Sequence, residues 1–554
     1  MKKGMFLAIT IAALAIWSCS NTGWQEDEMN VEPQPQTTST IEGVKVPNPY
    51  SVEAMKAACD VLYPTTRTEG SISDEVIVAT HIYARFLPTD KEQMDFLLDT
   101  GWELFNYPLD VEFDYDPSEY HDPSLPDDQI TWQYTVIPID TTLPTDITYE
   151  ILEECYIPDD DETEVESTAG TIDIAAIEAL SVNYAETGVM NPSASTMALT
   201  RRTYTGTITV DGSPVKGVKV RLKNGVIFKT TSTSNNGSYS VTGMLGNSPK
   251  VEVLFENNSK DYKVGFGFDL LLPTSINLNT TRTYNFTKTN NHKGWILCNT
   301  NNAVCDYYEV CSRFRISTPP RQLRVWAIPW GREDDITAAA PLLHHKTGYY
   351  IGLNMTELIK FIITGNLRTT PIPTGFSRIL TYFGPDVVLC NSDLMNTLDI
   401  FTCAFHELAH TSHFRNTYSS SIMQAQWWKH VVEYEANCIV TDTNSPYGYI
   451  DTPNNGYCGV TEMWAHAVER ICIQEILNHN IILYSQQSYP SQIDYWFKPE
   501  IIWDLHSKEG IPLQELYSAL TKDATSISAY KQILTNKYPY YQASINHTFS
   551  SYGF

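Results

Sequence analysis

The chain has 554 residues, more than one ordinary domain holds, so we expect three or four domains. Its formal net charge is −28, which argues against nucleic acid as a partner because an acidic protein repels phosphate backbones. Apolar residues make up 42% and charged residues only 18%, a mix typical of a secreted globular protein rich in β structure.

The N-terminus carries a targeting signal. Two lysines precede an apolar run over residues 5–17, which is too short to span a bilayer and fits the core of a signal peptide. The run is followed by Ser18 and Cys19, which resemble the cleavage site of a bacterial lipoprotein. The resemblance implies that the signal peptide, residues 1–18, is removed and that Cys19 is the lipid attachment site. The alternative is an ordinary secretory signal with an incidental cysteine.

Residues 19–45 are rich in Pro, Thr and Gln and predict a flexible, lipid-anchored linker. Ser20 and the acidic stretch 25–28 resemble the segment that follows the lipidated cysteine in surface-exposed lipoproteins of Gram-negative bacteria. The resemblance implies an outer-membrane lipoprotein exposed at the cell surface. Ten further cysteines remain, an even number that allows some pairing in an exported chain.

Residues 46–200 predict an accessory mixed α/β module. We expect helices over 51–62, 91–98 and 146–154 and strands over 76–87 and 130–139. Ser51 is placed to cap the first helix. No chemistry is evident in this module, so a recognition or accessory role is the default.

Residues 201–290 predict a small antiparallel β-sandwich, because short strands alternate with turn residues. Asp211-Gly212 and the Asn-Asn-Gly sequence at 235–237 mark two of the turns. Strands are expected over 204–210, 218–222, 228–232, 238–241 and 251–255. The Gly-x-Pro-x-x-Gly-Val element at 212–218 and the Asn-Gly-x-Tyr element at 236–239 resemble the carboxypeptidase regulatory-like domain. The resemblance implies a spacer or stability domain without catalytic residues.

Residues 291–554 contain the motif that carries chemistry. Strands are expected over 323–328 and 387–390, followed by long helices. His406 and His410 are four residues apart and share one helical face, where their imidazoles can take two corners of a zinc tetrahedron. Glu407 follows the first histidine and can act as the general base toward a metal-bound water.

Zinc in a catalytic site needs a third protein ligand. His413 is near in sequence, but three residues past His410 its side chain is expected to point away from the metal. Glu433 lies on the next predicted helix, over 420–440, and Ala436 follows it by three residues. This arrangement resembles the gluzincin metallopeptidases, which implies zinc bound by His406, His410 and Glu433. Glu435 is the rival third ligand.

Stabilisation of the oxyanion usually involves a Tyr or His beside the metal. Tyr457 and His466 flank a segment that leads into another helix, and either is a candidate catalytic residue, although a purely structural role is open for each.

The sequence therefore predicts a multidomain α+β protein: an accessory module, a β-sandwich and a mostly helical, zincin-like metallopeptidase domain. We expect it to hydrolyse peptide bonds of extracellular proteins or glycoproteins with Zn²⁺. Two other functions remain open: a zinc-containing surface binding protein or adhesin without catalysis, and a glycan-capture lipoprotein of an outer-membrane uptake system.

Overall fold

The structure is a computed structural model of the whole chain. It describes residues 43–554 apart from the segments 65–70, 114–116, 118–119, 127–128, 160–162, 169, 193–201, 244, 246–247, 266–271, 329–336, 343, 346–383, 391–394, 442–446 and 480–494. Within described helices and strands, the side chains left undescribed are those of 390, 421, 432–433, 435–437, 439–441 and 476–479. The predicted signal peptide, Cys19 and nearly all of the predicted linker lie outside the described residues.

The first module is built around a three-stranded antiparallel sheet with the order β4 (Gln133–Pro138), β2 (His81–Leu87) and β5 (Thr148–Cys155). Four helices belong to this module: α2 (Val52–Leu62), α3 (Ile72–Val76), α4 (Lys91–Asp99) and α5 (Ile174–Thr187). Two short strand pairs complete it: β1 (Val44–Lys45) with β3 (Val111–Glu112), and β6 (Glu164–Ser167) with β7 (Gly170–Asp173). The helix expected from residue 51 is confirmed, since Ser51 Oγ accepts a hydrogen bond from the backbone N–H of Ala54 at 3.1 Å.

Two expectations for this module are wrong. The helix expected over 146–154 is instead strand β5, because the segment pairs along the whole of β2 and this long-range pairing overrides local helix propensity. The strand expected from residue 76 begins only at His81, because Ser71 caps the short helix α3 over residues 72–76.

Eight strands of residues 202–286, all those described there except β14 (Tyr262–Gly265), form two small sheets that share one hydrophobic core. One contains β12 (Ser238–Gly243), β8 (Arg202–Val210), β16 (Thr283–Phe286) and the short β9 (Ser213–Pro214). The other has the order β11 (Ile227–Ser232), β10 (Lys219–Asn224), β13 (Lys250–Leu254) and β15 (Ser275–Asn277). The strands expected here are confirmed, and so is the turn at Asp211-Gly212, where φ is 48° and 79°. The expectation of wholly antiparallel sheets is wrong at one strand, because β16 returns from a distant part of the chain and pairs parallel to β8. Inward residues such as Ile208, Val220 and Val253 are fully buried.

A third sheet joins distant parts of the chain. Its order is β14 (Tyr262–Gly265), β17 (Leu323–Ile328), β19 (Val387–Cys390) and β18 (Thr337–Ala339). β14 runs parallel to β17 and β17 parallel to β19, whereas β18 is antiparallel. Because β14 precedes the long helices in sequence, this sheet ties residues 202–286 to the C-terminal part of the chain.

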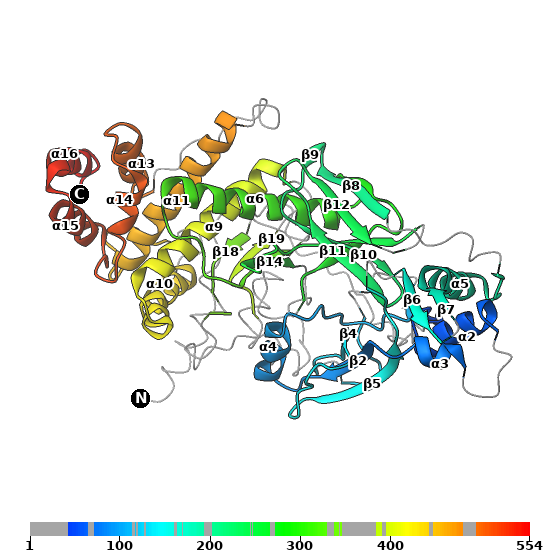
Figure 1. The fold of residues 1–554 in the computed structure, drawn as a ribbon. Coiled ribbons are helices and arrows are strands. Elements are labelled where there is room, and N and C mark those ends of the chain that lie inside the picture. The colour runs from blue at the N-terminus through cyan, green and yellow to red at the C-terminus, as the bar shows by residue number, and fades with distance from the viewer. Residues whose placement is uncertain are drawn as a thin grey trace, which may run out of the picture.

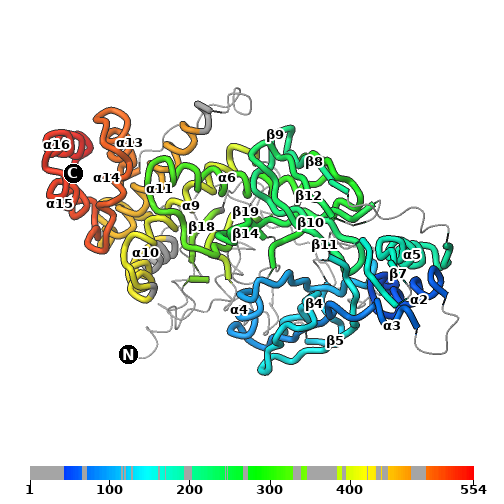
Figure 2. The backbone as a smooth tube through the Cα atoms, viewed as in Figure 1, coloured from blue at the N-terminus to red at the C-terminus, as the bar shows by residue number. Residues whose placement is uncertain are grey.

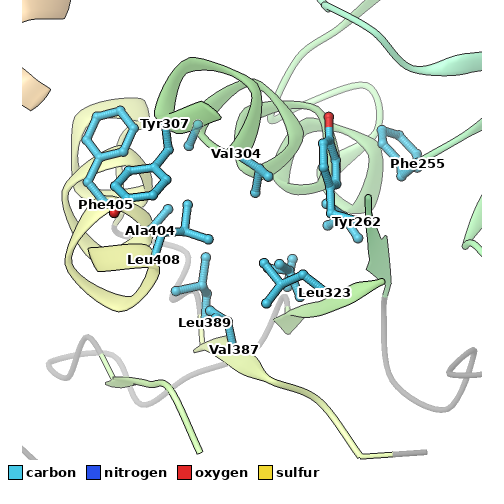
Figure 3. Packing of buried hydrophobic residues seen from close by; sticks show 14 of the residues in the cluster. Phe255, Tyr262, Val304, Tyr307, Leu323, Val387, Leu389, Ala404, Phe405 and Leu408 are labelled. Carbon is cyan, nitrogen blue, oxygen red and sulfur yellow. The ribbon is translucent and has the colours of Figure 1, made fainter. Parts of the chain in front are cut away.

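Both faces of the third sheet are covered. On one face pack α6 (His292–Phe314) and α9 (Thr397–Thr417), and Figure 3 shows Leu408 of α9 next to Leu389 of the sheet and Phe405 next to Tyr307 of α6. On the other face, Trp326 and Val388 belong to a buried cluster with residues of β2 and α4. The first module therefore packs against the back of the sheet that supports α9 (Figure 1).

The C-terminal region is helical. α10 (Ser421–Thr441) and α11 (Gly456–His479) follow α9, and the chain ends in α13 (Glu500–Ser507), α14 (Leu513–Ser518), α15 (Ile527–Lys537), the 3-10 turn η4 (Pro539–Tyr541) and α16 (Gln542–Ser551). These last helices lie at the opposite end of the molecule from α2, α3 and α5 (Figure 2). The fold is thus mixed α/β and multidomain, with several small sheets and a helical C-terminal region. Among the described helices, none is both long enough and apolar enough to cross a membrane.

Candidate metal centre

Helix α9 presents its histidines on the side away from the sheet. Asn396 and Asp399 form a capping box at its N-terminus, each side chain accepting a backbone N–H of the other. At about 100° per residue, Ala404, Phe405 and Leu408 share the face that packs on the sheet, and His406 and His410 fall on the opposite face. The helix is thereby fixed by its apolar face, and its two imidazoles point at a neighbouring helix.

That neighbour is α11, which packs alongside α9 and contributes three polar side chains to the contact. Glu462, His466 and Glu469 are spaced by four and three residues, so they form one stripe on the helix. Glu462 and Glu469 are buried, and the His466 side chain is 18% exposed. Buried ionisable groups at this density need partners, and here the partners are the histidines of α9.

The central contacts are short and mutual. The Nε2 atoms of His406 and His410 lie 3.1 Å apart. One carboxylate oxygen of Glu462 lies 3.3 Å from His406 Nε2, and the other lies 3.2 Å from His410 Nε2. Ring contacts continue the cluster, with the His466 centroid 4.3 Å from His406 and the Trp428 centroid 5.7 Å from His410.

These separations fit a divalent metal. Zinc–nitrogen bonds of about 2.0–2.1 Å at tetrahedral angles place two ligand atoms roughly 3.3–3.4 Å apart. The observed spacings of 3.1, 3.2 and 3.3 Å are close to that value. Three atoms of the cluster, Glu462 Oε2, His466 Nε2 and His410 Nδ1, are buried without a hydrogen bond to any described residue. The first two face one another at 3.9 Å, where a metal would satisfy both. His406, Glu462 and His466 also form a group whose ligand atoms all lie within 4.8 Å of one another.

Glu469 contacts the ring nitrogens of His406 and His466 that point away from the centre of the cluster. Its Oε2 lies 3.2 Å from His406 Nδ1 and 3.3 Å from His466 Nδ1. Histidines that bind metals usually donate their second ring N–H to a carboxylate, which fixes the ring orientation and leaves the other nitrogen free to bind. Glu469 therefore orients two imidazoles with one oxygen.

The charges of the cluster are strongly coupled. Burial disfavours the charged form of His406, but the Glu462 and Glu469 carboxylates outweigh it and hold the pKa of His406 well above its usual value. Burial likewise opposes ionisation of Glu469, yet hydrogen bonds with the two histidines lower the pKa of Glu469 to about 2. His410 differs, because burial is only partly offset by Glu462 and the pKa of His410 falls.

Glu407 is the buried carboxyl group next to these residues. Burial raises the pKa of Glu407 to about 8, with His406 opposing the shift and Glu462 and Glu469 adding to it. A carboxyl group next to a set of candidate metal ligands is suited by its position to accepting and returning a proton.

The remaining candidates from the sequence differ in where they lie. The Glu433 and Glu435 side chains are outside the described residues, although both positions belong to α10. His413 is fully buried with its ring 5.1 Å from that of Trp427, and burial lowers the pKa of His413 to about 3. Tyr457 opens α11 and stacks on His430, with ring centroids 4.7 Å apart. His466, in contrast, lies inside the cluster.

Sequence reasoning did not identify Glu462 and Glu469. The available signal was a Glu-x-x-x-His-x-x-Glu pattern at 462–469, in which acidic and imidazole groups share one face of an otherwise apolar helix. The nine cysteines whose side chains the structure describes are all free thiols.

No protein-family model, no curated protein and no solved structure matches this chain. Any function must therefore be argued from the geometry of the candidate metal centre.

Proposed function

We propose that this chain is a zinc-dependent metallopeptidase in which His406, His410 and Glu462 hold the metal. The observation that carries the proposal is the convergence of two imidazole nitrogens and the two Glu462 carboxylate oxygens, with contacts of 3.1–3.3 Å, beside a buried Glu407. In this arrangement Glu462 takes the place for which the gluzincin resemblance suggested Glu433. The C-terminal region would then be zincin-like in function, with its third ligand on α11 rather than α10.

Zinc, when bound, would act as a Lewis acid that polarises a carbonyl group and lowers the pKa of water. The chain's own residues supply the rest. Glu407 accepts a proton from the attacking water and returns it to the departing amine nitrogen, so its carboxylate is regenerated. Glu469 holds His406 with Nδ1 occupied, which leaves Nε2 as the nitrogen that faces the metal.

Peptide bonds of extracellular proteins or glycoproteins are the proposed substrates. This part of the proposal rests on the lipoprotein-like N-terminus, which would put the enzyme on the outer membrane through Cys19. Residues 202–286 would serve as the carboxypeptidase regulatory-like spacer, since their two sheets contain no part of the metal cluster.

The test compares zinc-loaded wild type with Glu407→Gln on a mixed peptide library read by mass spectrometry. The amide is isosteric but cannot accept the proton, so we expect zinc content to stay at the wild-type level and cleavage to fall by about 10²–10⁴-fold. Glu509→Gln, at an exposed position just after α13, is the matched control and should cleave normally. If wild type holds zinc yet is as inert as Glu407→Gln, the peptidase proposal fails and a non-catalytic zinc-binding surface protein replaces it.

A further inference from the structure

The metal cluster is built from two matching pairs of side chains. His406 and His410 are four residues apart on α9, and Glu462 and His466 are four residues apart on α11. Side chains at this spacing lie one above the other on a helix, so two facing helices bring four donor groups to one place. A site with three protein ligands uses only three of them.

The fourth group, His466, is held in position from both sides. Its Nδ1 lies 3.3 Å from Glu469 Oε2, which engages that nitrogen and leaves Nε2 to face inward. Its ring stacks on Tyr495, with centroids 4.5 Å apart at 27°, and on Phe497, with centroids 5.7 Å apart at 17°. On the inner side the His406 ring lies 4.3 Å away. The imidazole is therefore clamped between an aromatic stack and the metal ligands.

Among the residues that the structure describes, none makes a hydrogen bond with the inward nitrogen. His466 Nε2 is buried and lies 3.9 Å from Glu462 Oε2, which itself lies 3.3 Å from His406 Nε2. A buried nitrogen left without a partner costs free energy unless something binds it. A metal held by Glu462 would meet it after a shift of about half an ångström, because tetrahedral ligand atoms lie roughly 3.3–3.4 Å apart.

We infer that His466 is a fourth protein ligand, so that the metal is held by three imidazoles and one carboxylate. The inference rests on the metal site of the proposed function but not on peptidase activity. Such a donor set suits a borderline divalent cation such as Zn²⁺ or Co²⁺. Zinc sites with four protein ligands are usually closed, whereas catalytic sites keep a position open. Hydrolysis at this centre would therefore need either a fifth coordination position or release of His466.

Cobalt reports the coordination directly, because its visible absorption changes with the number and type of ligands. We would load the purified protein with Co²⁺ and compare wild type, His466→Ala and His430→Ala, a control that removes an exposed histidine of α10. His466→Ala should change the spectrum and weaken Zn²⁺ binding about 10²–10³-fold, as loss of one ligand does, while His430→Ala should match wild type. A His466→Ala spectrum identical to wild type, with Zn²⁺ affinity within about threefold, would overturn the inference.

A second measurement needs no variant. X-ray absorption of the zinc-loaded wild type counts histidine ligands, and we expect three. A count of two overturns the fourth ligand while leaving the proposed peptidase intact. Three histidines in a protein that cleaves no peptide would instead retain the four-donor site and remove the peptidase. No metal bound at all would remove both.

Discussion

The choice of the third ligand gives the sharpest prediction, because Glu433 and Glu462 are both glutamates on helices next to α9. Glu462→Gln keeps the size of the side chain but removes the charge that faces His406 and His410. Zinc binding to four-ligand structural sites is worth about 10–16 kcal/mol, or roughly 2.5–4 kcal/mol for each ligand. At about 1.4 kcal/mol for each factor of ten, the Kd for zinc should rise about 10²–10³-fold.

The assay is competition for zinc with a chromogenic chelator, together with circular dichroism to confirm that each variant is folded. Glu433→Gln is the matched control and should leave the Kd within about threefold of wild type. The reasoning is refuted if Glu433→Gln weakens zinc binding by 10²-fold or more while Glu462→Gln does not. That outcome would restore the ligand set suggested by the gluzincin resemblance.

Three further predictions concern the surroundings of the site. Glu469→Gln should raise the Kd for zinc about 10–100-fold, because the residue orients two histidines, and an unchanged Kd would show that the orientation does not depend on this carboxylate. In the metal-free protein, burial raises the pKa of Glu407 to about 8 from an ordinary value of 4.5. Between these two pH values the folded state therefore binds more protons than the unfolded state. The free energy of unfolding that Glu407 removes from the protein thus grows as the pH rises. Urea unfolding should therefore show Glu407→Gln becoming more stable than wild type from pH 4.5 to 8, and a pH-independent difference would contradict the assigned burial. Trp326→Ala should lower the free energy of unfolding by about 3–5 kcal/mol, because this ring is buried between the third sheet and the first module; a loss below 1 kcal/mol in the same assay would mean that the two do not pack as described.

Many features of the fold could be predicted from local patterns in the sequence. Ser51 and the Asp211-Gly212 turn act on residues next to them in the chain, and the structure confirms both. The motif at 406–410 is equally local, since its helical spacing alone puts the two histidines on one face. In each case the relevant partner lies within a few residues, which is where single-sequence reasoning is strongest.

The failures have a common cause, which is that the deciding partner is distant in the chain. The segment of strand β5 was expected to be helical. Its partner strand β2 lies more than 60 residues earlier in the chain, so the local sequence does not indicate the pairing. Glu462 is 52 residues beyond His410, and only the packing of α11 on α9 brings them to 3.2 Å. The helix α6 was not anticipated either; its buried side includes Asn299 and Asn301, polar residues that mask an apolar periodicity.

The central claim is that a metal sits between α9 and α11. Its most direct test is a crystal of the zinc-loaded protein, with diffraction measured on both sides of the zinc absorption edge. We predict one anomalous peak about 2.0–2.2 Å from His406 Nε2, His410 Nε2 and a Glu462 oxygen. A fully zinc-loaded crystal with no peak between these three side chains, or with its peak at the Glu433 carboxylate instead of Glu462, would contradict the account.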